Sequence, residues 1–301
     1  MPVQSPVLFL IFNRPDKTKQ VFEAIRQAKP TKLFVAADGP RKDKAGENEI
    51  CQQTRTIIHS IDWECELKTL FRDENLGCKV AVSSAINWFF ENVEEGIILE
   101  DDCLPNQSFF HFCDTLLNHY RDDKRIMHIG GSNFQDGQIR GDGSYYFSYV
   151  YHIWGWATWR RAWEKYDIEM HGLDKFIDSG YLKSLYPERS HQQSWMQVFN
   201  LIKSNKLNTW DYQWTFACWA NNGLSIIPNS NLVSNIGYDT NATHTSTNDN
   251  LSERKKEMIN KITYPTITQR DIEADKYTID KYLIKNWHYK TLLTLKNLFI
   301  K

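Results

Sequence analysis

Three consecutive acids, Glu100, Asp101 and Asp102, are the strongest chemical signal in the sequence. They directly follow the apolar run 96–99, so they stand where a buried strand would end. Adjacent carboxylates repel one another, and a divalent cation offsets that cost. Mg²⁺ and Mn²⁺ often take one or two carboxylates together with substrate phosphates. The triplet therefore predicts a nucleotide diphosphate held through Mn²⁺ or Mg²⁺; an acidic turn that heads a helix is the alternative.

A second candidate is the carboxylate of Asp211, which stands among Trp210, Tyr212 and Trp214 in the sequence. An apolar frame raises the pKa of a carboxyl group and suits it to general-base catalysis. Asp211 also directly precedes an apolar helical run, which is the position of a helix N-cap. From the residues alone, the cap explains Asp211 more simply than a catalytic base does.

Aromatic residues crowd the segment 145–163, which contains nine of them in 19 residues. Within it, Trp154, Gly155 and Trp156 stand out, because a glycine between two indoles lets the backbone approach a ligand closely. Aromatic rings offer flat apolar faces with polar edges, which suit sugars. The tripeptide predicts a sugar-binding turn, and an aromatic core is the alternative.

The first half of the chain predicts the scaffold for these residues. Short apolar runs that indicate strands alternate with amphipathic stretches that indicate helices. The expected strands are 7–12, 32–37, 66–71, 96–101, 126–131 and, later in the chain, 223–228. A further strand is expected over 145–156, and residues 157–166 have helical spacing. The pattern predicts an α/β fold with a mostly parallel, Rossmann-like sheet flanked by helices, and a smaller second subregion.

In such a sheet, ligands bind beyond the carboxyl ends of the strands. Polar residues stand there after each of the first four strands: Asn13 and Arg14, Asp38, Asn75, and the acidic triplet. Each alone is explained by turn chemistry. Their shared place at one edge predicts a common binding site.

Several classes of protein are excluded by composition and by missing motifs. A net charge of −1 gives no reason to bind nucleic acid. The motifs GxGxxG, GxxxxGK[ST] and GxSxG are absent, which argues against dinucleotide dehydrogenases, P-loop kinases and α/β-hydrolases. No secretory signal is visible, and six scattered cysteines without a CxxC pair predict reduced thiols. We expect a cytoplasmic protein.

Four segments in this order, LFLIFNRP, FVAADGPR, FRDENLG and ILEDDCLPNQSFFHF, resemble nucleotide-sugar glycosyltransferases of the GT-A fold. The resemblance is to the inverting N-acetylglucosaminyltransferase I family, and it covers residues 5–235. It implies transfer of a sugar from a nucleotide-diphosphate donor, such as UDP-GlcNAc, to a hydroxyl of a glycan or lipid-linked glycan.

The resemblance also implies roles for single residues. The donor-binding set that it implies is Asn13, Arg14, Asp38, Asn75, Glu100 and Asp101. At the position of Asn75 that family has His. The last acid, Asp102, would bind the metal directly.

On the acceptor side, the resemblance implies that Trp154, Gly155 and Trp156 border the cleft. Because that family has a Trp-Asp pair at the position of Asp211, the resemblance favours this residue as the base that deprotonates the acceptor. The implied halves are residues 1–131 for the donor and 132–236 for the acceptor.

Two C-terminal segments complete the chain. Residues 237–274 predict a flexible region in which a Thr/Asn-rich lid brings His244 to the pyrophosphate or metal; a solvated loop histidine is the alternative. Residues 275–301 form a tail, in which 283–301 combine an apolar helical face with lysines and no acid. This pattern predicts peripheral contact with the inner face of an anionic membrane, and docking on protein is the alternative.

Two other functions stay open. A non-catalytic glycan-binding protein on the same fold would keep the aromatic residues but leave the acidic triplet without a task. A sugar nucleotidyltransferase normally has a Gly-rich, basic loop after the first strand, where this chain has Asn13-Arg14-Pro15-Asp16. The sequence therefore favours glycosyl transfer.

Overall fold

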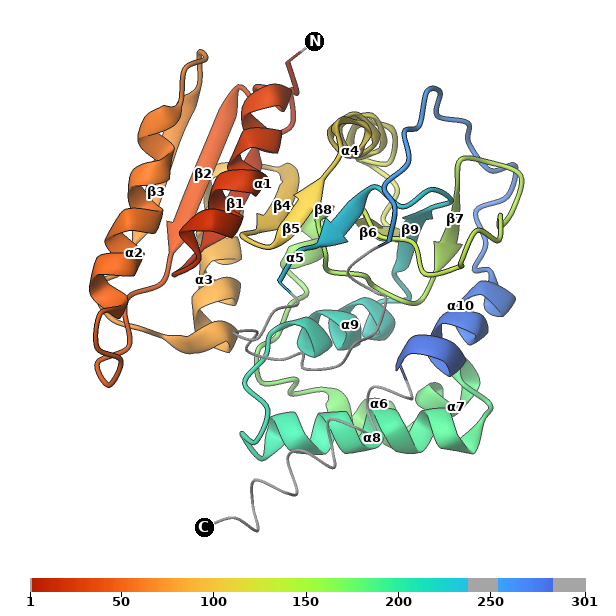
Figure 1. Cartoon of the computed structure of the whole chain (residues 1–301). Helices are drawn as coiled ribbons and strands as arrows, with labels where there is room; N and C mark the ends of the chain where they lie inside the picture. The colour runs from red at the N-terminus through yellow and green to blue at the C-terminus, as the bar shows by residue number, and fades with distance from the viewer. Residues whose placement is uncertain (1, 238–253, 284–301) are drawn as a thin grey trace.

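The computed structural model describes residues 2–237 and 254–283, and these form an α/β structure (Figure 1). His244 and residues 284–301 lie outside the described residues, so the predicted metal contact of His244 and the membrane contact of the tail stay predictions. Within the described ranges, no helix is long and apolar enough to cross a membrane.

The described strands form one large mixed sheet, in the order β3-β2-β1-β4-β8-β6-β9-β7. Their bounds are β1 Val7–Ile11, β2 Lys32–Ala37, β3 Glu66–Phe71, β4 Glu95–Glu100, β6 Ile126–Gly130, β7 Tyr145–Ser148, β8 Trp156–Trp159 and β9 Leu224–Pro228. The pairings β1–β2, β1–β4, β2–β3 and β6–β9 are parallel, whereas β8 runs against β4 and β6, and β7 against β9. A second, two-stranded sheet pairs β5 (Cys103–Pro105) with β10 (Val233–Asn235).

Helices cover both faces of the large sheet (Figure 1). The longer ones are α1 Pro15–Ala28, α2 Glu47–Thr56, α3 Gly77–Asn92, α4 Gln107–His119, α8 Arg189–Lys203 and α9 Asp211–Ala220. Shorter ones are η1 Ile57–Ser60, α5 Arg160–Trp163, α6 Leu173–Asp178, α7 Tyr181–Leu185, α10 Ile272–Thr278 and η2 Ile279–Leu283.

Side chains of β1 alternate between two hydrophobic cores. Leu8 and Leu10 pack into a core that also takes residues of α3, α8 and α9. Phe9 and its neighbours pack into a second core with residues of α1 and α4. A strand buried on both faces reads as a continuous apolar run, which is why the sequence revealed it. The predicted α/β fold with a mostly parallel sheet flanked by helices is confirmed.

The aromatic segment departs from the prediction. The expected strand over 145–156 is two strands, because β7 ends at Ser148 and β8 begins at Trp156. Residues expected to be helical from 157 onward are strand as far as Trp159, and α5 begins only at Arg160. The pairing of β8 with β4, Trp156 opposite Ile98, overrides the helical spacing.

Most indoles of the second half belong to the core. Trp156, Trp163, Trp210 and Trp214 are buried, and five pairs of their ring centroids lie 5.2–6.4 Å apart. The high aromatic content therefore reflects packing between the sheet and α9 more than an open binding surface.

The described part of the expected lid region is bonded to the body of the protein. Glu257 accepts a hydrogen bond from Asn106, the backbone N–H of Ile259 donates to Ser108, and Thr263 bonds Ser144. After this stretch, α10 is fixed to β7 through Asp275, whose carboxylate accepts hydrogen bonds from Ser148 and from the backbone N–H of Tyr149.

Candidate functional site

The acidic triplet lies where the strand order reverses direction. From β1 the chain builds outward to β2 and β3 on one side, and it continues with β4 on the other side. In open α/β sheets the loops diverge at such a reversal, and ligands bind in the crevice between them. We therefore expect the binding crevice between the loops after β1 and β4, and we call this region, which contains Arg14 and the triplet, the crevice. Arg14 follows β1, and its Nη1 lies 2.8 Å from Asp102 Oδ2 and 3.7 Å from Asp101 Oδ1. The structure thus brings the predicted Arg14 and the triplet together.

Two carboxyl groups of the triplet, those of Asp101 and Glu100, have raised pKa values. Burial raises the pKa of Asp101 to about 7, helped by the neighbouring charge of Asp102, while Arg14 and Lys17 oppose the shift. Burial also raises the pKa of Glu100 well above its usual range, and the carboxylates of Asp102, Asp101 and Asp211 add to the shift. Such a cluster favours the binding of a cation.

The donor set fits a hard divalent cation that is held only in part by protein. In the described ranges, no group of three or more His, Cys, Asp or Glu side chains converges as metal ligands. Carboxylate oxygens are nevertheless the ligands that Mg²⁺ and Mn²⁺ prefer, and one or two of them suffice when phosphates complete the shell. The predicted metal contact of Asp102 stays a prediction, and in the structure its Oδ2 accepts a hydrogen bond from Arg14.

A short backbone segment crosses directly over Asp102. The backbone N–H of Ile236 donates to the Asp102 carbonyl at 2.8 Å, and the carbonyl of Ile236 accepts a hydrogen bond from Lys17. At Gly237, a Cβ atom would lie 2.2 Å from Asp102 Oδ2, so only glycine allows this approach. One side of the carboxylate is therefore closed, and sequence reasoning missed both Lys17 and Gly237.

Asp38 has a structural task that explains its residue type. Its carboxylate accepts hydrogen bonds from the backbone N–H groups of Gly39 (3.0 Å), Leu76 (3.0 Å) and Gly77 (3.1 Å), and from Asn75 Nδ2 (2.9 Å). These donors use the lone pairs of both oxygens. Asp38 caps the start of α3 from the end of β2, and Asn75 is a partner in that cap.

The side chain of Asn13, which was predicted to contact the donor, binds Glu47 instead. Asn13 Nδ2 donates to Glu47 Oε1 at 2.9 Å, in the first turn of α2. Glu47 is buried and also accepts hydrogen bonds from Arg41. Asn13, Asp38 and Asn75 therefore shape the loops around the crevice, and a direct contact of any of them with a nucleotide stays a prediction.

The structure decides against the cap explanation of Asp211. The N-cap residue of α9 is Trp210, and Asp211 is the first residue of the helix, where an acid complements the helix dipole. The Asp211 carboxylate accepts a hydrogen bond from the Thr209 hydroxyl. Asp211 lies within electrostatic range of the triplet, since its charge is among the causes that raise the pKa of Glu100. The Asp211 carboxylate is half-buried.

Cys78, at the start of α3, marks the point where the carboxylates gather. Burial raises the pKa of its thiol far above the usual range, and the charges of Glu100, Asp211, Asp38 and Asp102 all add to the shift. Acids at the ends of β2 and β4 and at the start of α9 thus lie within electrostatic range of one helix start. No pattern in the sequence pointed to Cys78, because these neighbours come from distant segments.

The predicted acceptor tripeptide divides into different roles. Trp156 is fully buried and stacks on Trp210 with ring centroids 5.6 Å apart, so its assignment to the acceptor is wrong. Gly155 is needed for packing, because it has φ +63° and a Cβ there would lie 2.8 Å from Val233 Cγ2. Trp154 is half-buried beside Phe134, and it alone stays a predicted acceptor contact.

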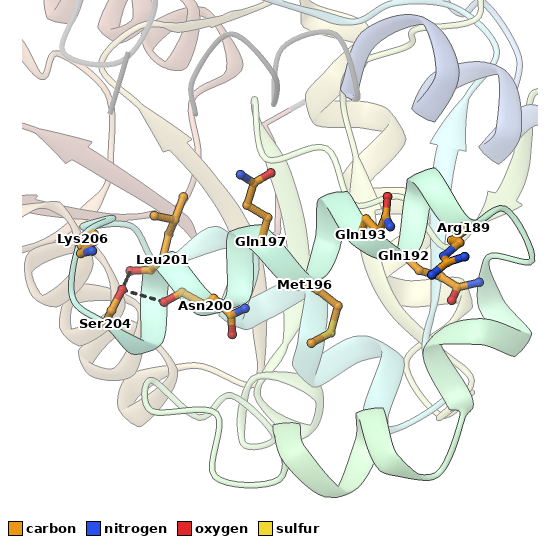
Figure 2. Close-up of a pocket in the computed structure, with 9 residues that line it drawn as sticks. All are labelled: Arg189, Gln192, Gln193, Met196, Gln197, Asn200, Leu201, Ser204 and Lys206. Carbon is orange, nitrogen blue, oxygen red and sulfur yellow. Dashed lines mark hydrogen bonds between the residues drawn. The ribbon is translucent and has the colours of Figure 1, made fainter. Parts of the chain in front are cut away.

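A hollow of about 590 Å³ lies elsewhere, on the outer face of α8 (Figure 2). Amide side chains line most of it, with cations toward its ends: Arg189, Gln192, Gln193, Met196, Gln197, Asn200, Leu201, Ser204 and Lys206. It contains no carboxylate and none of the predicted site residues. The chemistry of the chain is therefore concentrated at the crevice and not at this hollow.

Comparisons with known proteins give no family for this chain. No protein-family model matches it, and no curated protein matches it. One similar solved structure is HddC from Yersinia pseudotuberculosis, at 12% identity over 57% of this chain and 87% of that chain, with a TM-score of 0.34. Another is 4-diphosphocytidyl-2C-methyl-D-erythritol synthase from Anaerococcus prevotii, at 13% identity over 58% and 83%, with a TM-score of 0.35.

These findings overturn the resemblance to the N-acetylglucosaminyltransferase I family. No family model supports it, and neither of the two similar structures is a member of that glycosyltransferase family. The roles that the resemblance implied for single residues lose that support. Because TM-scores of 0.34 and 0.35 carry no conclusion about activity, function has to be argued from the residues of the crevice.

Proposed function

We propose that the chain is a transferase that binds a nucleoside diphosphate sugar together with Mn²⁺ or Mg²⁺ in the crevice after β1 and β4. The observation that supports this proposal is the acidic triplet beside Arg14 at the point where the strand order reverses. The described carboxylates supply too few converging ligands for a protein-only metal site. A pyrophosphate that brings its own oxygen ligands completes such a site.

Each residue of the crevice then has a task. Asp102 holds the cation, and Arg14, once released from Asp102, is placed to bind a phosphate oxygen. The cation, when bound, offsets the negative charge that develops on the phosphates during transfer. The backbone of Ile236 and Gly237 shields Asp102 from solvent on one side.

The same ligand serves two reactions. It is the donor of a glycosyltransferase and the product of a sugar nucleotidyltransferase, the alternative that the sequence kept open. The two similar structures, with TM-scores of 0.34 and 0.35, do not decide between the two reactions. The two cations near the triplet, Arg14 and Lys17, also suit the pyrophosphate that this reaction releases.

Asp211 is the observation that favours glycosyl transfer to a hydroxyl. A sugar phosphate that attacks a nucleotide is already ionised at neutral pH, so it needs no base, and a nearby carboxylate repels it. A hydroxyl acceptor has a proton to lose, and Asp211 offers a half-buried carboxylate at the start of α9 that can accept it. We therefore place glycosyl transfer first and nucleotidyl transfer second.

Calorimetry of UDP and UDP-GlcNAc, with and without Mn²⁺, tests the shared part of the proposal. We expect metal-dependent binding that Asp102→Ala abolishes, with folding retained because the side chain stands at a strand end. Glu169→Ala, which removes an exposed acid outside the crevice, is the matched control. Unchanged affinity in Asp102→Ala contradicts the metal assignment.

A product assay separates the two reactions. Release of UDP from UDP-GlcNAc in the presence of a hydroxyl acceptor supports glycosyl transfer. Release of pyrophosphate from a nucleoside triphosphate and a sugar 1-phosphate supports the second candidate instead.

A further inference from the structure

Asn208 joins the loop before α9 to the start of α3. Its Oδ1 accepts a hydrogen bond from the backbone N–H of Lys79 at 2.8 Å. Lys79 is in the first turn of α3, whose N–H groups have no partner within the helix. Asn208 therefore caps α3 across 129 residues of sequence.

The contact is close on both sides. Gly77 has φ +75°, and a Cβ there would lie 2.8 Å from Asn208 Nδ2. A side chain at position 77 would both strain the backbone and push the amide away. The fit thus depends on a glycine in the helix and an amide in the loop.

The same helix start is capped from the other half of the chain by Asp38. Its carboxylate takes the N–H groups of Leu76 and Gly77, while Asn208 takes that of Lys79. Two side chains, one after β2 and one before α9, divide the N–H groups between them. The start of α3 is therefore the place where the loop that bears Asp211 is tied to the crevice.

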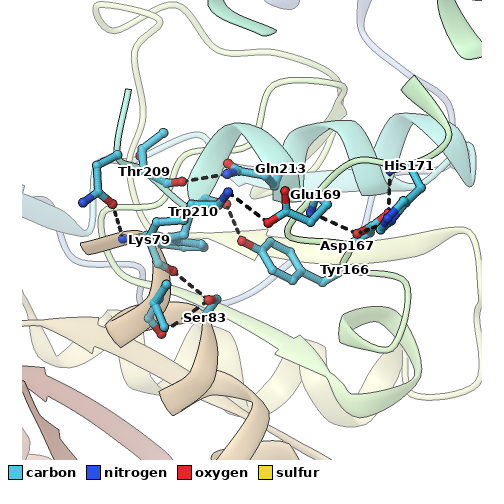
Figure 3. Close-up of polar contacts among 11 residues, drawn as sticks. Lys79, Ser83, Tyr166, Asp167, Glu169, His171, Thr209, Trp210 and Gln213 are labelled. Atoms are coloured by element: carbon cyan, nitrogen blue, oxygen red, sulfur yellow. Dashed lines mark hydrogen bonds and ion pairs between the residues drawn. The ribbon is translucent and has the colours of Figure 1, made fainter. Parts of the chain in front are cut away.

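From Asn208 onward the loop is fixed by further hydrogen bonds (Figure 3). Gln213 Nε2 donates to the Thr209 carbonyl at 2.7 Å, and the Tyr166 hydroxyl donates to the Trp210 carbonyl at 3.2 Å. The Thr209 hydroxyl in turn donates to the Asp211 carboxylate. Asn208 is three residues from Asp211, the first residue of α9, and these hydrogen bonds link the two positions. We therefore expect a shift at Asn208 to move the Asp211 carboxylate as well.

We propose that Asn208 is a positioning residue that sets the place of the Asp211 carboxylate relative to Glu100, Asp101 and Asp102. This inference rests on the proposed glycosyl transfer and adds a residue that touches neither donor nor acceptor. Misplacement of a reacting group by about 1 Å costs about 10²-fold in rate. A helix cap without this task would affect the melting temperature only.

The test compares three variants of the full chain with the unaltered protein. Asn208→Ala removes the acceptor, and Asn208→Asp keeps it. Lys79→Met removes the ion pair of Lys79 with Glu169 (3.3 Å) but retains the N–H that Asn208 binds, so it is the matched control. The readouts are kcat and KM for UDP-GlcNAc, the pH profile of kcat, and calorimetric affinity for UDP with Mn²⁺.

We expect Asn208→Ala to lower kcat by about 10- to 100-fold, with a shifted pH profile, because the base is misplaced. KM and the affinity for UDP with Mn²⁺ stay within about threefold, since the crevice itself is intact. Asn208→Asp and Lys79→Met keep kcat within about fivefold. If Asn208→Ala does not fold, Asn208→Gln takes its place with the same expected result, because it moves the amide by one methylene.

An unchanged kcat and pH profile in a folded Asn208→Ala, with a lower melting temperature, overturns the inference and leaves Asn208 as a helix cap. Failure of the unaltered protein to bind UDP with Mn²⁺ or to turn over UDP-GlcNAc overturns the proposed function, and the inference with it. The binding measurement on the unaltered protein distinguishes these two failures.

Discussion

The crevice after β1 and β4 and the tryptophan-rich region around β8 and α9 are both crowded with one kind of side chain. In the crevice, Glu100 and Asp101 stand beside Asp102 although burial and the neighbouring carboxylates raise the pKa of Glu100 and of Asp101 and so disfavour their charged forms. Around β8, Trp156 and its neighbouring indoles stand together because burial favours them. Carboxylates that lie together in a buried place are unfavourable unless a ligand offsets their charge, so they point to a ligand. Indoles that lie together in a buried place are favourable in themselves and need no ligand.

This difference explains why the two predictions had different outcomes. The acidic triplet was predicted as a site because adjacent carboxylates repel one another. The structure places it beside Arg14, at the point where the strand order reverses. The tripeptide Trp154-Gly155-Trp156 was predicted from residue type alone, and two of its three members are core residues. An unfavourable arrangement is therefore a better guide to a site than a suggestive composition.

Replacing Asp211 by Asn gives the largest expected effect. The amide keeps an oxygen for the Thr209 hydroxyl but cannot take a proton, so we expect turnover to fall by about 10²–10⁴-fold. The melting temperature is expected to fall little, because the half-buried side chain keeps its size and its Thr209 hydrogen bond and loses only its charge in the first turn of α9. Turnover and melting of this variant are measured beside Asp174→Asn, which changes an exposed acid on α6. Near-normal turnover removes Asp211 from the mechanism.

Trp156→Ala tests the other region and is expected to lower the free energy of unfolding by about 3–5 kcal/mol, the usual cost of deleting a buried aromatic side chain. The indole is fully buried between His128 and Trp210, so a cavity is left behind. Urea denaturation followed by circular dichroism measures the change. A loss below about 1 kcal/mol contradicts the assignment of Trp156 to the core.

The pKa of Asp101 predicts how stability depends on pH. The folded chain raises this pKa to about 7, so it binds the proton more tightly than the unfolded chain does. The stabilisation from Asp101 is therefore present below about pH 4 and is lost as the pH rises toward 7. Between pH 8 and pH 5 we expect Asp101 to add about 1–3 kcal/mol to the free energy of unfolding.

Asp101→Asn lacks this contribution, so urea unfolding of both proteins at pH 5 and pH 8 isolates it. The gain on acidification is expected to be smaller in Asp101→Asn than in the unaltered protein. Equal gains in both proteins contradict a raised pKa for Asp101.

The smallest effect is expected for Trp154→Ala, which sharpens the comparison within the aromatic segment. Trp154 is half-buried, so its loss is expected to cost about 1 kcal/mol of unfolding free energy, well below the cost for Trp156. Urea denaturation of the two variants side by side provides the measurement. Equal losses would mean that Trp154 is as much a core residue as Trp156.

The sequence predicts a strand most directly when that strand is buried on both faces of the sheet. The run 32–37 is the strand β2 with the expected bounds, since continuous apolar residues with polar stops leave little choice. The edge strand β3 also has the expected bounds, 66–71, although it is largely exposed and contains three polar residues. The strand β8 was missed, because its pairing with β4 is a contact between segments about 60 residues apart. The spacing of apolar residues within one segment cannot show that the segment pairs with a distant strand.

The sequence by itself determined the strands, their carboxyl ends and the excess of acid after β4, because each depends on neighbours in the chain. The tertiary structure alone decided that Asp38 and Asn208 cap one helix start, that Trp156 is core, and that Asp211 lies within electrostatic range of Glu100. These assignments depend on which side chains from distant segments meet, and on which hydrogen-bond acceptors are already occupied. Both are properties of packing in three dimensions, where residues separated by more than a hundred positions share the N–H groups of one helix start.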